Sequence, residues 1–262
     1  AELPAATCLE NVIFASQVLL GTGLGVVLFQ RIPVFALLVI DAASFMGSLV
    51  MLFLAERQYV ARPAPLPVGD PQPVALRWQT LTLRQKRSLL ILPALAAVGS
   101  PAMALLPALA QQINPENAAG LALPLLFARS LGQLCGPLLL RKESLTRFAA
   151  RTPLLLSCLA LFLAAYGLLP FLSAWVVLAL GMIFIAHLAS NIVFAAGTFG
   201  VLSNFQAIQI SAASGKAWRW QTLSASLFTG LAAMTATIMG AAQTLYAVSA
   251  IALLLVALVL AR

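Results

Sequence analysis

Long apolar runs, each close in length to a membrane-spanning helix, recur along this chain of 262 residues. About 20 apolar residues in a helix cross the roughly 30 Å hydrocarbon core of a bilayer. Short polar or proline-containing segments separate the runs. The pattern therefore predicts an all-α polytopic membrane protein with about eight transmembrane helices. The predicted spans are residues 12–29, 34–55, 89–110, 118–140, 153–169, 175–202, 222–239 and 244–261.

Two of the predicted spans are expected to depart from a regular helix. Pro93, Pro101 and Pro107 fall inside the third span, and we expect it to be kinked or partly unwound. The sixth span is too long for a perpendicular crossing, so we expect a tilt or a break near Gly197 and Gly200. An amphipathic stretch between the sixth and seventh spans is expected to lie outside the membrane.

The longest polar segment, residues 56–87, divides the predicted spans into two followed by six. Proline fixes the backbone and removes a hydrogen-bond donor, so closely spaced prolines exclude a continuous helix and predict an extended linker. Five prolines fall within eleven residues of this segment: Pro63, Pro65, Pro67, Pro71 and Pro73.

Positive charge is distributed unequally between the two sides of the predicted membrane. With eight spans, the linker, the fourth-to-fifth and sixth-to-seventh loops and the C-terminus share one side, which carries thirteen of the fifteen Lys and Arg residues. Arg31 lies on the other side, and Arg129 lies within a span. The positive-inside rule predicts that the basic side, with both chain ends, is cytoplasmic.

Composition restricts the classes of partner and chemistry. Only 8% of the residues are charged, against about 25% in soluble domains. The formal charge of +8 lies in loops, where lipid headgroups explain it better than nucleic acid, so the lipid bilayer is the expected partner. Cys8, Cys135 and Cys158 form no CxxC pair, and no metal site or disulfide is predicted. No nucleophile elbow, phosphate loop or HExxH motif predicts an enzyme or a cofactor.

Residues 39–45, VIDAASF, carry a resemblance to a known family. With Asp41, Ser44 and Phe45 in place, this segment resembles the D-A-x-S-F element in the sixth helix of major facilitator superfamily exporters, particularly the branch that includes enterobactin exporters. In that family the corresponding helix is peripheral, so Asp41 is expected to bond to backbone at a helix packing point.

Two pairs of glycines extend the resemblance. Gly21 and Gly25 match the family's fifth-helix G-P-x-x-G pattern, with Thr22 in place of the proline. Gly132 and Gly136, with the basic loop after them, are similar to a degenerate form of the family's motif after its eighth helix. Spacing of four along a helix also permits close helix approach, and packing is the expected role of all four glycines.

The order of spans resembles the family as well, because its long cytoplasmic linker joins helices six and seven. Residues 1–55 would be the last two helices of the N-terminal bundle, 56–87 the linker and 88–262 the C-terminal six-helix bundle. The resemblance implies a partial major-facilitator fold, with the missing N-terminal helices of the same protein as a partner. It also implies a bacterial inner-membrane antiporter that exports a small molecule by alternating access.

Ionisable and amide side chains inside spans are functional candidates, since a charged residue at mid-membrane costs about 2.5–3.5 kcal/mol on insertion scales. Arg129 and Gln133 lie one helical turn apart on the same face. The pair would bind an anionic substrate or gate the interface between the two halves. The alternative is a structural arginine bonded to helix carbonyls or to residues of the missing helices.

His187 and Asn191 show the same spacing in the sixth predicted span. His187 is the only histidine and would relay protons near neutral pH, or it is a neutral histidine hydrogen-bonded between helices. The resemblance implies that this helix lines the central cavity. Glu10 and Gln17 share a face of the first span and would look into the interface between halves, unless Glu10 reaches water.

These observations predict a secondary active transporter for proton-coupled efflux of a small-molecule substrate, with the proton as coupling ion. The alternative is a truncated or transport-inactive membrane protein that acts as a scaffold or assembly partner. A membrane enzyme would need a carboxylate or histidine cluster that the sequence lacks. The chain begins at Ala1 without Met, and we expect the natural protein to be longer.

Overall fold

The computed structural model describes residues 3–28, 31–60, 76–116, 118–140, 142–172 and 175–261. The described residues form helices joined by short turns, and eight of these helices are long and apolar enough to cross a membrane. This confirms the predicted all-α polytopic membrane fold. In chain order the elements are α1 (Leu3–Leu28), α2 (Val34–Val60), the 3-10 turn η1 (Trp78–Thr80), α3 (Leu83–Ile113), α4 (Ala118–Leu138), α5 (Lys142–Ala150), α6 (Thr152–Leu168), the 3-10 turn η2 (Leu169–Phe171), α7 (Val176–Asn204), α8 (Ala207–Met239) and α9 (Ala241–Ala261).

The chain divides into two compact units. The smaller unit, residues 23–74, holds the end of α1 and all of α2. The larger unit combines residues 1–22 with residues 75–262. The flanking helices extend into both ends of the predicted linker, residues 56–87. Helix α2 continues to Val60, and α3 begins at Leu83. The prolines of the linker lie outside the described residues.

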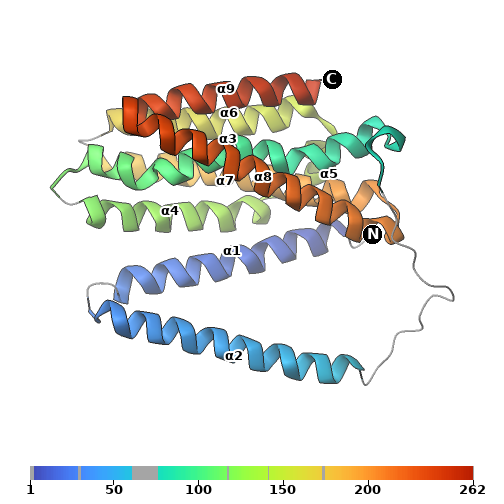
Figure 1. Cartoon of the computed structure of the whole chain (residues 1–262), viewed down its shortest axis with the longest axis horizontal. Helices are drawn as coiled ribbons and strands as arrows, with labels where there is room; N and C mark the ends of the chain where they lie inside the picture. The colour runs from blue at the N-terminus through green and yellow to red at the C-terminus, as the bar shows by residue number, and fades with distance from the viewer. Residues whose placement is uncertain are drawn as a thin grey trace. The chain divides into compact units, whose positions relative to one another are not determined.

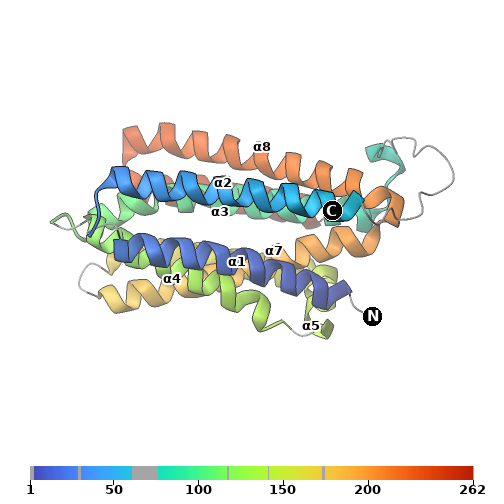
Figure 2. The same cartoon turned by 90° about the horizontal axis from the view of Figure 1, so that it is seen from below.

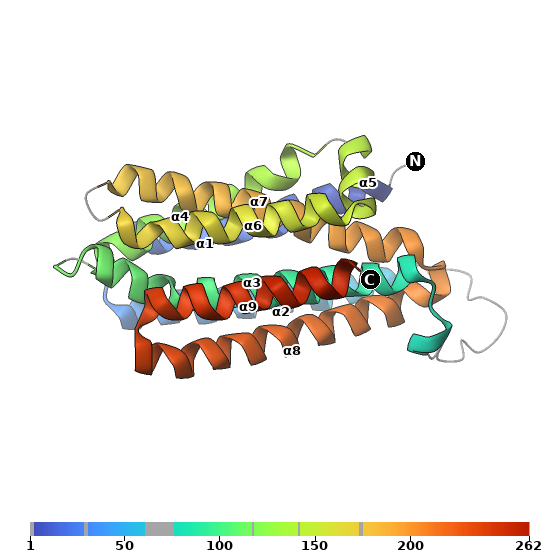
Figure 3. The same ribbon diagram turned by 90° about the horizontal axis from the view of Figure 1, so that it is seen from above.

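Helix α3 lies at the centre of the larger unit, where it packs against α4, α6, α7, α8 and α9 (Figure 1, Figure 3). A capping box starts the helix: Gln85 N donates to Thr82 Oγ1 at 3.3 Å, and Thr82 N donates to Gln85 Oε1 at 3.0 Å. The end of the linker is fixed nearby, because Lys216 Nζ of α8 donates to the Leu76 carbonyl at 2.9 Å.

The prolines of α3 do not unwind it, so that part of the prediction is wrong. A single helix runs through Pro93, Pro101 and Pro107. Pro93 and Pro101 are buried against neighbouring helices. In a membrane, packing against neighbouring helices and local adjustments offset the hydrogen bonds that proline removes.

Helix α7 is also continuous, so the break expected near Gly197 and Gly200 is wrong. A Cβ on Gly197 would lie 2.8 Å from Leu92 Cδ2 of α3, and one on Gly200 would lie 3.3 Å from Ser88 Oγ. These glycines therefore bring α7 close to α3 instead of interrupting the helix.

Glycines also permit the close approach of α4 and α7, which lie side by side (Figure 2). A Cβ on Gly132 would collide with the Phe184 carbonyl, and one on Gly136 would lie 2.8 Å from the Leu188 carbonyl. Gly21 and Gly25 differ, because a Cβ at either would meet no atom of the described residues within 4 Å. Close packing at those two positions stays a prediction.

The segment around the predicted seventh span is one long helix. Residues 207–221, part of the amphipathic stretch expected to lie outside the membrane, are the first half of α8, and their position relative to the membrane stays a prediction. A capping box between Gln206 and Gln209 starts the helix before the predicted span, and Ala213 and Ala217 are fully buried. A helix missed by the apolar pattern, α5, occupies the predicted basic loop and is anchored by the buried Leu145.

Candidate binding cavity

A cavity of about 360 Å³ lies within the larger unit, near the middle of its long helices. Helices α1, α3, α4, α6, α7 and α8 all contribute side chains to its wall. The lining combines aromatic and polar side chains. The aromatic lining residues are Phe14, Phe162, Phe194 and Trp218, and the polar ones are Ser100, Gln133, His187, Ser190, Asn191, Gln221, Thr222 and Ser226.

His187 is held on α7 by contacts with α6. The Tyr166 hydroxyl and His187 Nε2 are 2.8 Å apart, and both residues are almost entirely buried. The Phe162 ring meets the imidazole edge-on, with 5.5 Å between ring centroids. The imidazole is therefore fixed in orientation by one hydrogen bond and one aromatic contact.

Three buried polar atoms on the wall of this cavity have no hydrogen-bond partner among the described residues. They are Gln133 Oε1 of α4, His187 Nδ1 of α7 and Gln221 Oε1 of α8. A buried polar atom without a partner costs about 1–3 kcal/mol. All three residues line the same cavity.

Arg129 lies beside the cavity without lining it. It is one helical turn from Gln133 on α4, and it is close enough to interact electrostatically with both Tyr166 and His187. Its Nε is buried and has no hydrogen-bond partner among the described residues. Of the predicted pair, Gln133 lines the cavity and Arg129 does not.

Helix α1 reaches the polar face of α4 through a hydrogen bond between two hydroxyl groups. Thr22 Oγ1 donates to Ser130 Oγ at 3.0 Å, and Ser130 Oγ donates in turn to the Leu126 carbonyl at 3.0 Å. Thr22 occupies the position where the sequence departs from the G-P-x-x-G pattern. A proline there would offer no hydroxyl group for this contact.

No family model, no characterised protein and no solved structure matches this chain. In the part of the chain that the structure describes, no group of three His, Cys, Asp or Glu side chains is placed to hold a metal ion.

Asn191 lines the cavity next to His187, as their spacing indicates. Its Nδ2 donates to the His187 carbonyl at 3.2 Å, and the hydroxyl of Ser190 donates to the same carbonyl at 3.1 Å. These bonds tie both side chains to the backbone of α7, on the face that borders the cavity.

The remaining predicted residues are not among those that line this cavity. Glu10 and Gln17 are exposed, and the lining residue that α1 supplies is Phe14. Asp41 belongs to the smaller unit, where it is exposed and its carbonyl accepts a hydrogen bond from Ser44 Oγ at 2.7 Å. Phe45 is exposed on the same helix, α2, so the expected packing role of this segment stays a prediction.

Sequence reasoning missed Phe14, Trp218 and Gln221 as cavity residues. Phe14 and Trp218 are apolar residues of the kind that face lipid in most membrane helices. Gln221 fell just outside the predicted seventh span, although it lies near the middle of α8. The signal in the sequence for Gln221 was its position as a polar side chain next to a long apolar run.

Proposed function

We propose that this protein is a secondary active transporter that moves a small molecule across a membrane by alternating access. The observation that supports this most is the convergence of Gln133, His187 and Gln221 on one mid-bundle cavity, each with a buried polar atom lacking a partner. Transporters place their substrate sites near the middle of the bilayer, at the meeting point of several helices.

The lining of the cavity favours a compact amphipathic organic substrate. Its volume of about 360 Å³ falls within the range of roughly 300–1,000 Å³ that small-molecule sites occupy. Phe14, Phe194 and Trp218 would cover the apolar part of such a molecule. The two glutamine amides and His187 Nδ1 would bind its polar groups.

The direction and coupling of transport are part of the same proposal. We propose efflux driven by proton influx through the bacterial inner membrane, as the resemblance to major facilitator exporters implies. His187 is the candidate proton carrier because it lines the cavity, Tyr166 fixes its Nε2, and its Nδ1 has no partner among the described residues. Arg129 would set the electrostatic potential of that site.

The orientation in the membrane follows from the ends of the helices. The first turns of α3 and α6 meet the last turns of α7 and α9 at one end of the larger unit, where Arg84, Lys86 and Arg87 lie. Since basic residues gather on the cytoplasmic side, we propose that this end is cytoplasmic.

The alternative is a membrane scaffold without transport activity. The exposed apolar surface of α2 would suit such a role, but contact with lipid explains it equally well. A scaffold has no need of buried polar atoms lacking partners, since each lowers its stability. The cavity therefore favours the transporter.

Transport into everted membrane vesicles carrying the full-length protein tests the proposal. A panel of amphipathic compounds would be screened for uptake that requires an imposed pH gradient. Gln133→Leu should reduce transport of an active compound by about tenfold, equivalent to about 1.4 kcal/mol. The same change should leave thermal stability intact or raised, because it removes a buried polar atom that has no partner among the described residues.

The matched control is Gln243→Leu, which makes the same change at an exposed position on α9 outside the cavity. Transport by this variant should equal that of the wild type. If no compound in the panel is transported, or if both leucine variants behave alike, the proposed substrate site is wrong and the scaffold interpretation leads.

A further inference from the structure

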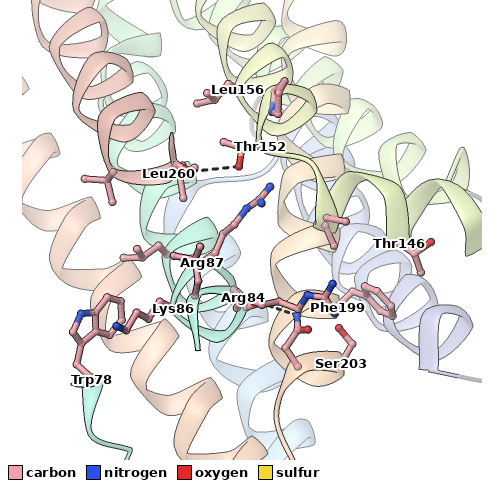
Figure 4. Close-up of a pocket in the computed structure, with 18 residues that line it drawn as sticks. Trp78, Arg84, Lys86, Arg87, Thr146, Thr152, Leu156, Phe199, Ser203 and Leu260 are labelled. Atoms are coloured by element: carbon pink, nitrogen blue, oxygen red, sulfur yellow. Dashed lines mark hydrogen bonds between the residues drawn. The ribbon is translucent and has the colours of Figure 1, made fainter. Parts of the chain in front are cut away.

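A second and larger cavity, of about 1200 Å³, lies at the basic end of the larger unit (Figure 4). The first turns of α3 and α6, the last turns of α7 and α9, and α5 surround it. None of its lining residues belongs to the mid-bundle cavity described above. It is therefore a separate site, with a chemistry of its own.

Positive charge dominates the lining of this cavity. Arg84, Lys86 and Arg87 project from the first two turns of α3, and no Asp or Glu occurs among the described residues that line it. Lys86 Nζ lies 5.6 Å from the centre of the Trp78 ring, a cation–π contact. The other two cations are free of such an aromatic contact among the described residues, and Arg84 extends toward Phe199 and Ser203 (Figure 4).

Arg87 is the lining residue whose buried side-chain nitrogens have no hydrogen-bond partner among the described residues. Its Nε and Nη2 are buried, and neither has a hydrogen-bond partner in the part of the chain that the structure describes. The side chain extends across the cavity toward Thr152 (Figure 4). Two guanidinium nitrogens are thus shielded from water without an acceptor, which is costly, and the planar fork of the group matches two oxygens of a phosphate or carboxylate.

The walls around Arg87 are held by side-chain hydrogen bonds between helices. Asn204 Nδ2 of α7 donates to Ser88 Oγ of α3 at 2.8 Å, and Gln85 Nε2 donates to the Asn204 carbonyl at 3.1 Å. On the opposite wall, Thr152 Oγ1 of α6 donates to the Leu260 carbonyl of α9 at 3.3 Å. The cavity is therefore a built feature of the fold, bounded on two sides by fixed helix ends.

The N-terminus of α6 adds to the positive potential. Thr152 begins this helix, and the side chain of the preceding Arg151 makes no capping hydrogen bond. The positive end of the helix dipole therefore points into the same cavity as the arginines. Leu90, Leu156 and Val259 supply an apolar wall beside this polar centre.

We propose that this cavity binds a phosphate group, with the buried atoms of Arg87 as its central donors and Arg84 as a second cation. The group belongs either to an anionic phospholipid, whose acyl chain would follow the apolar wall, or to a soluble phosphate compound. Both sources present the same oxygens to Arg87. The site is independent of the transport proposal, because it shares no lining residue with the mid-bundle cavity.

Thermal unfolding of the purified full-length protein in detergent tests the proposal. Three additions are compared at low salt: dioleoylphosphatidylglycerol, the uncharged lipid dioleoylglycerol, and inorganic phosphate. Phosphatidylglycerol should raise the melting temperature and dioleoylglycerol should not. If inorganic phosphate stabilises the protein alone and competes with the lipid, the soluble source is identified; stabilisation by lipid only identifies the headgroup.

The variant Arg87→Gln should weaken the binding by about tenfold or more, equivalent to about 1.4 kcal/mol. Arg219→Gln is the matched control, because it removes the same charge from an exposed residue of α8 outside the cavity. It should bind as the wild type does. Equal weakening in both variants would show that only general surface charge is involved and would overturn the site.

Failure of Arg87→Gln to fold would not remove the test. Arg84→Gln, at an exposed position, should then weaken the binding of the stabilising phosphate compound relative to Arg219→Gln. The wild type alone also decides the question. If neither phosphatidylglycerol nor phosphate raises its melting temperature above that with dioleoylglycerol, the proposal is wrong.

Discussion

The hydroxyl group of Tyr166 and Nε2 of His187 are 2.8 Å apart and join α6 to α7 in the interior of the bundle. Both side chains are at most 1% exposed. This bond provides the interhelical partner that the structural interpretation of His187 requires. His187 also lines the mid-bundle cavity, and its Nδ1 has no hydrogen-bond partner among the described residues, so the structural and functional interpretations are compatible.

The first prediction concerns this hydrogen bond. Tyr166→Phe removes the hydroxyl group and leaves Nε2 of the buried His187 without its partner. Hydrogen bonds between membrane helices contribute about 0.6 kcal/mol on average and up to about 1.7 kcal/mol. We expect destabilisation near the upper value, because both residues are buried. Thermal unfolding of the purified protein in detergent measures it.

Tyr246→Phe is the matched control for that experiment. The Tyr246 hydroxyl donates to the Gly167 carbonyl at 2.8 Å, but its side chain is 41% exposed, so loss of this bond leaves no fully buried side chain without its partner. A smaller loss of stability is expected for this variant. If Tyr246→Phe destabilised the protein as much as Tyr166→Phe, the buried bond to His187 would contribute no more to stability than an exposed hydrogen bond does.

Run length and charge were enough to predict the membrane helices. A helix that crosses a bilayer must satisfy its backbone hydrogen bonds internally, so about 20 consecutive apolar residues already determine both its type and its length. The second predicted span, residues 34–55, accordingly lies within α2, and the eighth lies within α9. Helix ends were less predictable, since polar residues continue α8 before its apolar run begins.

The effects of proline and glycine could not be predicted from the same pattern. Pro101 leaves α3 unbroken because α3 packs against five other helices, and Gly197 serves the contact with α3 instead of breaking α7. Both outcomes depend on which helices become neighbours. A local run of residues carries no information on that.

The sequence predicted only part of the candidate site, because the site also depends on which helices become neighbours. Helical spacing placed Arg129 with Gln133 on one face and His187 with Asn191 on another. Gln133, His187 and Asn191 line one cavity, whereas Arg129 does not. Phe14 and Gln221 complete the wall from α1 and α8. Their contribution depends on the packing of distant segments, which spacing along one helix does not describe.

The second prediction concerns the contact between α4 and α7. Gly132→Ala would place a methyl group against the Phe184 carbonyl and the Leu188 amide, both of which belong to the backbone of α7. Backbone atoms cannot rotate away as a side chain can, so the two helices must separate. Overpacking of this kind costs about 1–3 kcal/mol. We expect a lower melting temperature and a disturbed mid-bundle cavity.

Gly181→Ala provides the comparison within α7. A Cβ on Gly181 would meet no atom of the described residues within 4 Å, so the added methyl group is tolerated. Because alanine favours the helix over glycine by roughly 0.5–1 kcal/mol, this variant should be as stable as the wild type or slightly more stable. Equal melting temperatures for the Gly132 and Gly181 variants would contradict the close packing of α4 on α7.

The third prediction concerns Arg129, the charge beside the cavity. Arg129→Ala should lower transport by the full-length protein by about tenfold or more, equivalent to about 1.4 kcal/mol, while insertion into the membrane stays normal. The reason is that the guanidinium acts on His187 and Tyr166 electrostatically, and its buried Nε has no partner among the described residues. An arginine held only for stability would be expected to have its donors paired.

Transport and membrane content must be measured together to separate these interpretations of Arg129. Vesicle uptake gives the transport rate, and the amount of folded protein extracted from the same membranes gives the insertion. Arg219→Ala, the same change at an exposed position on α8, should alter neither quantity. Normal uptake by Arg129→Ala would remove Arg129 from the site. Loss of uptake in proportion to lost protein would make it a structural residue, because the charge would then be needed for folding and not for the cavity.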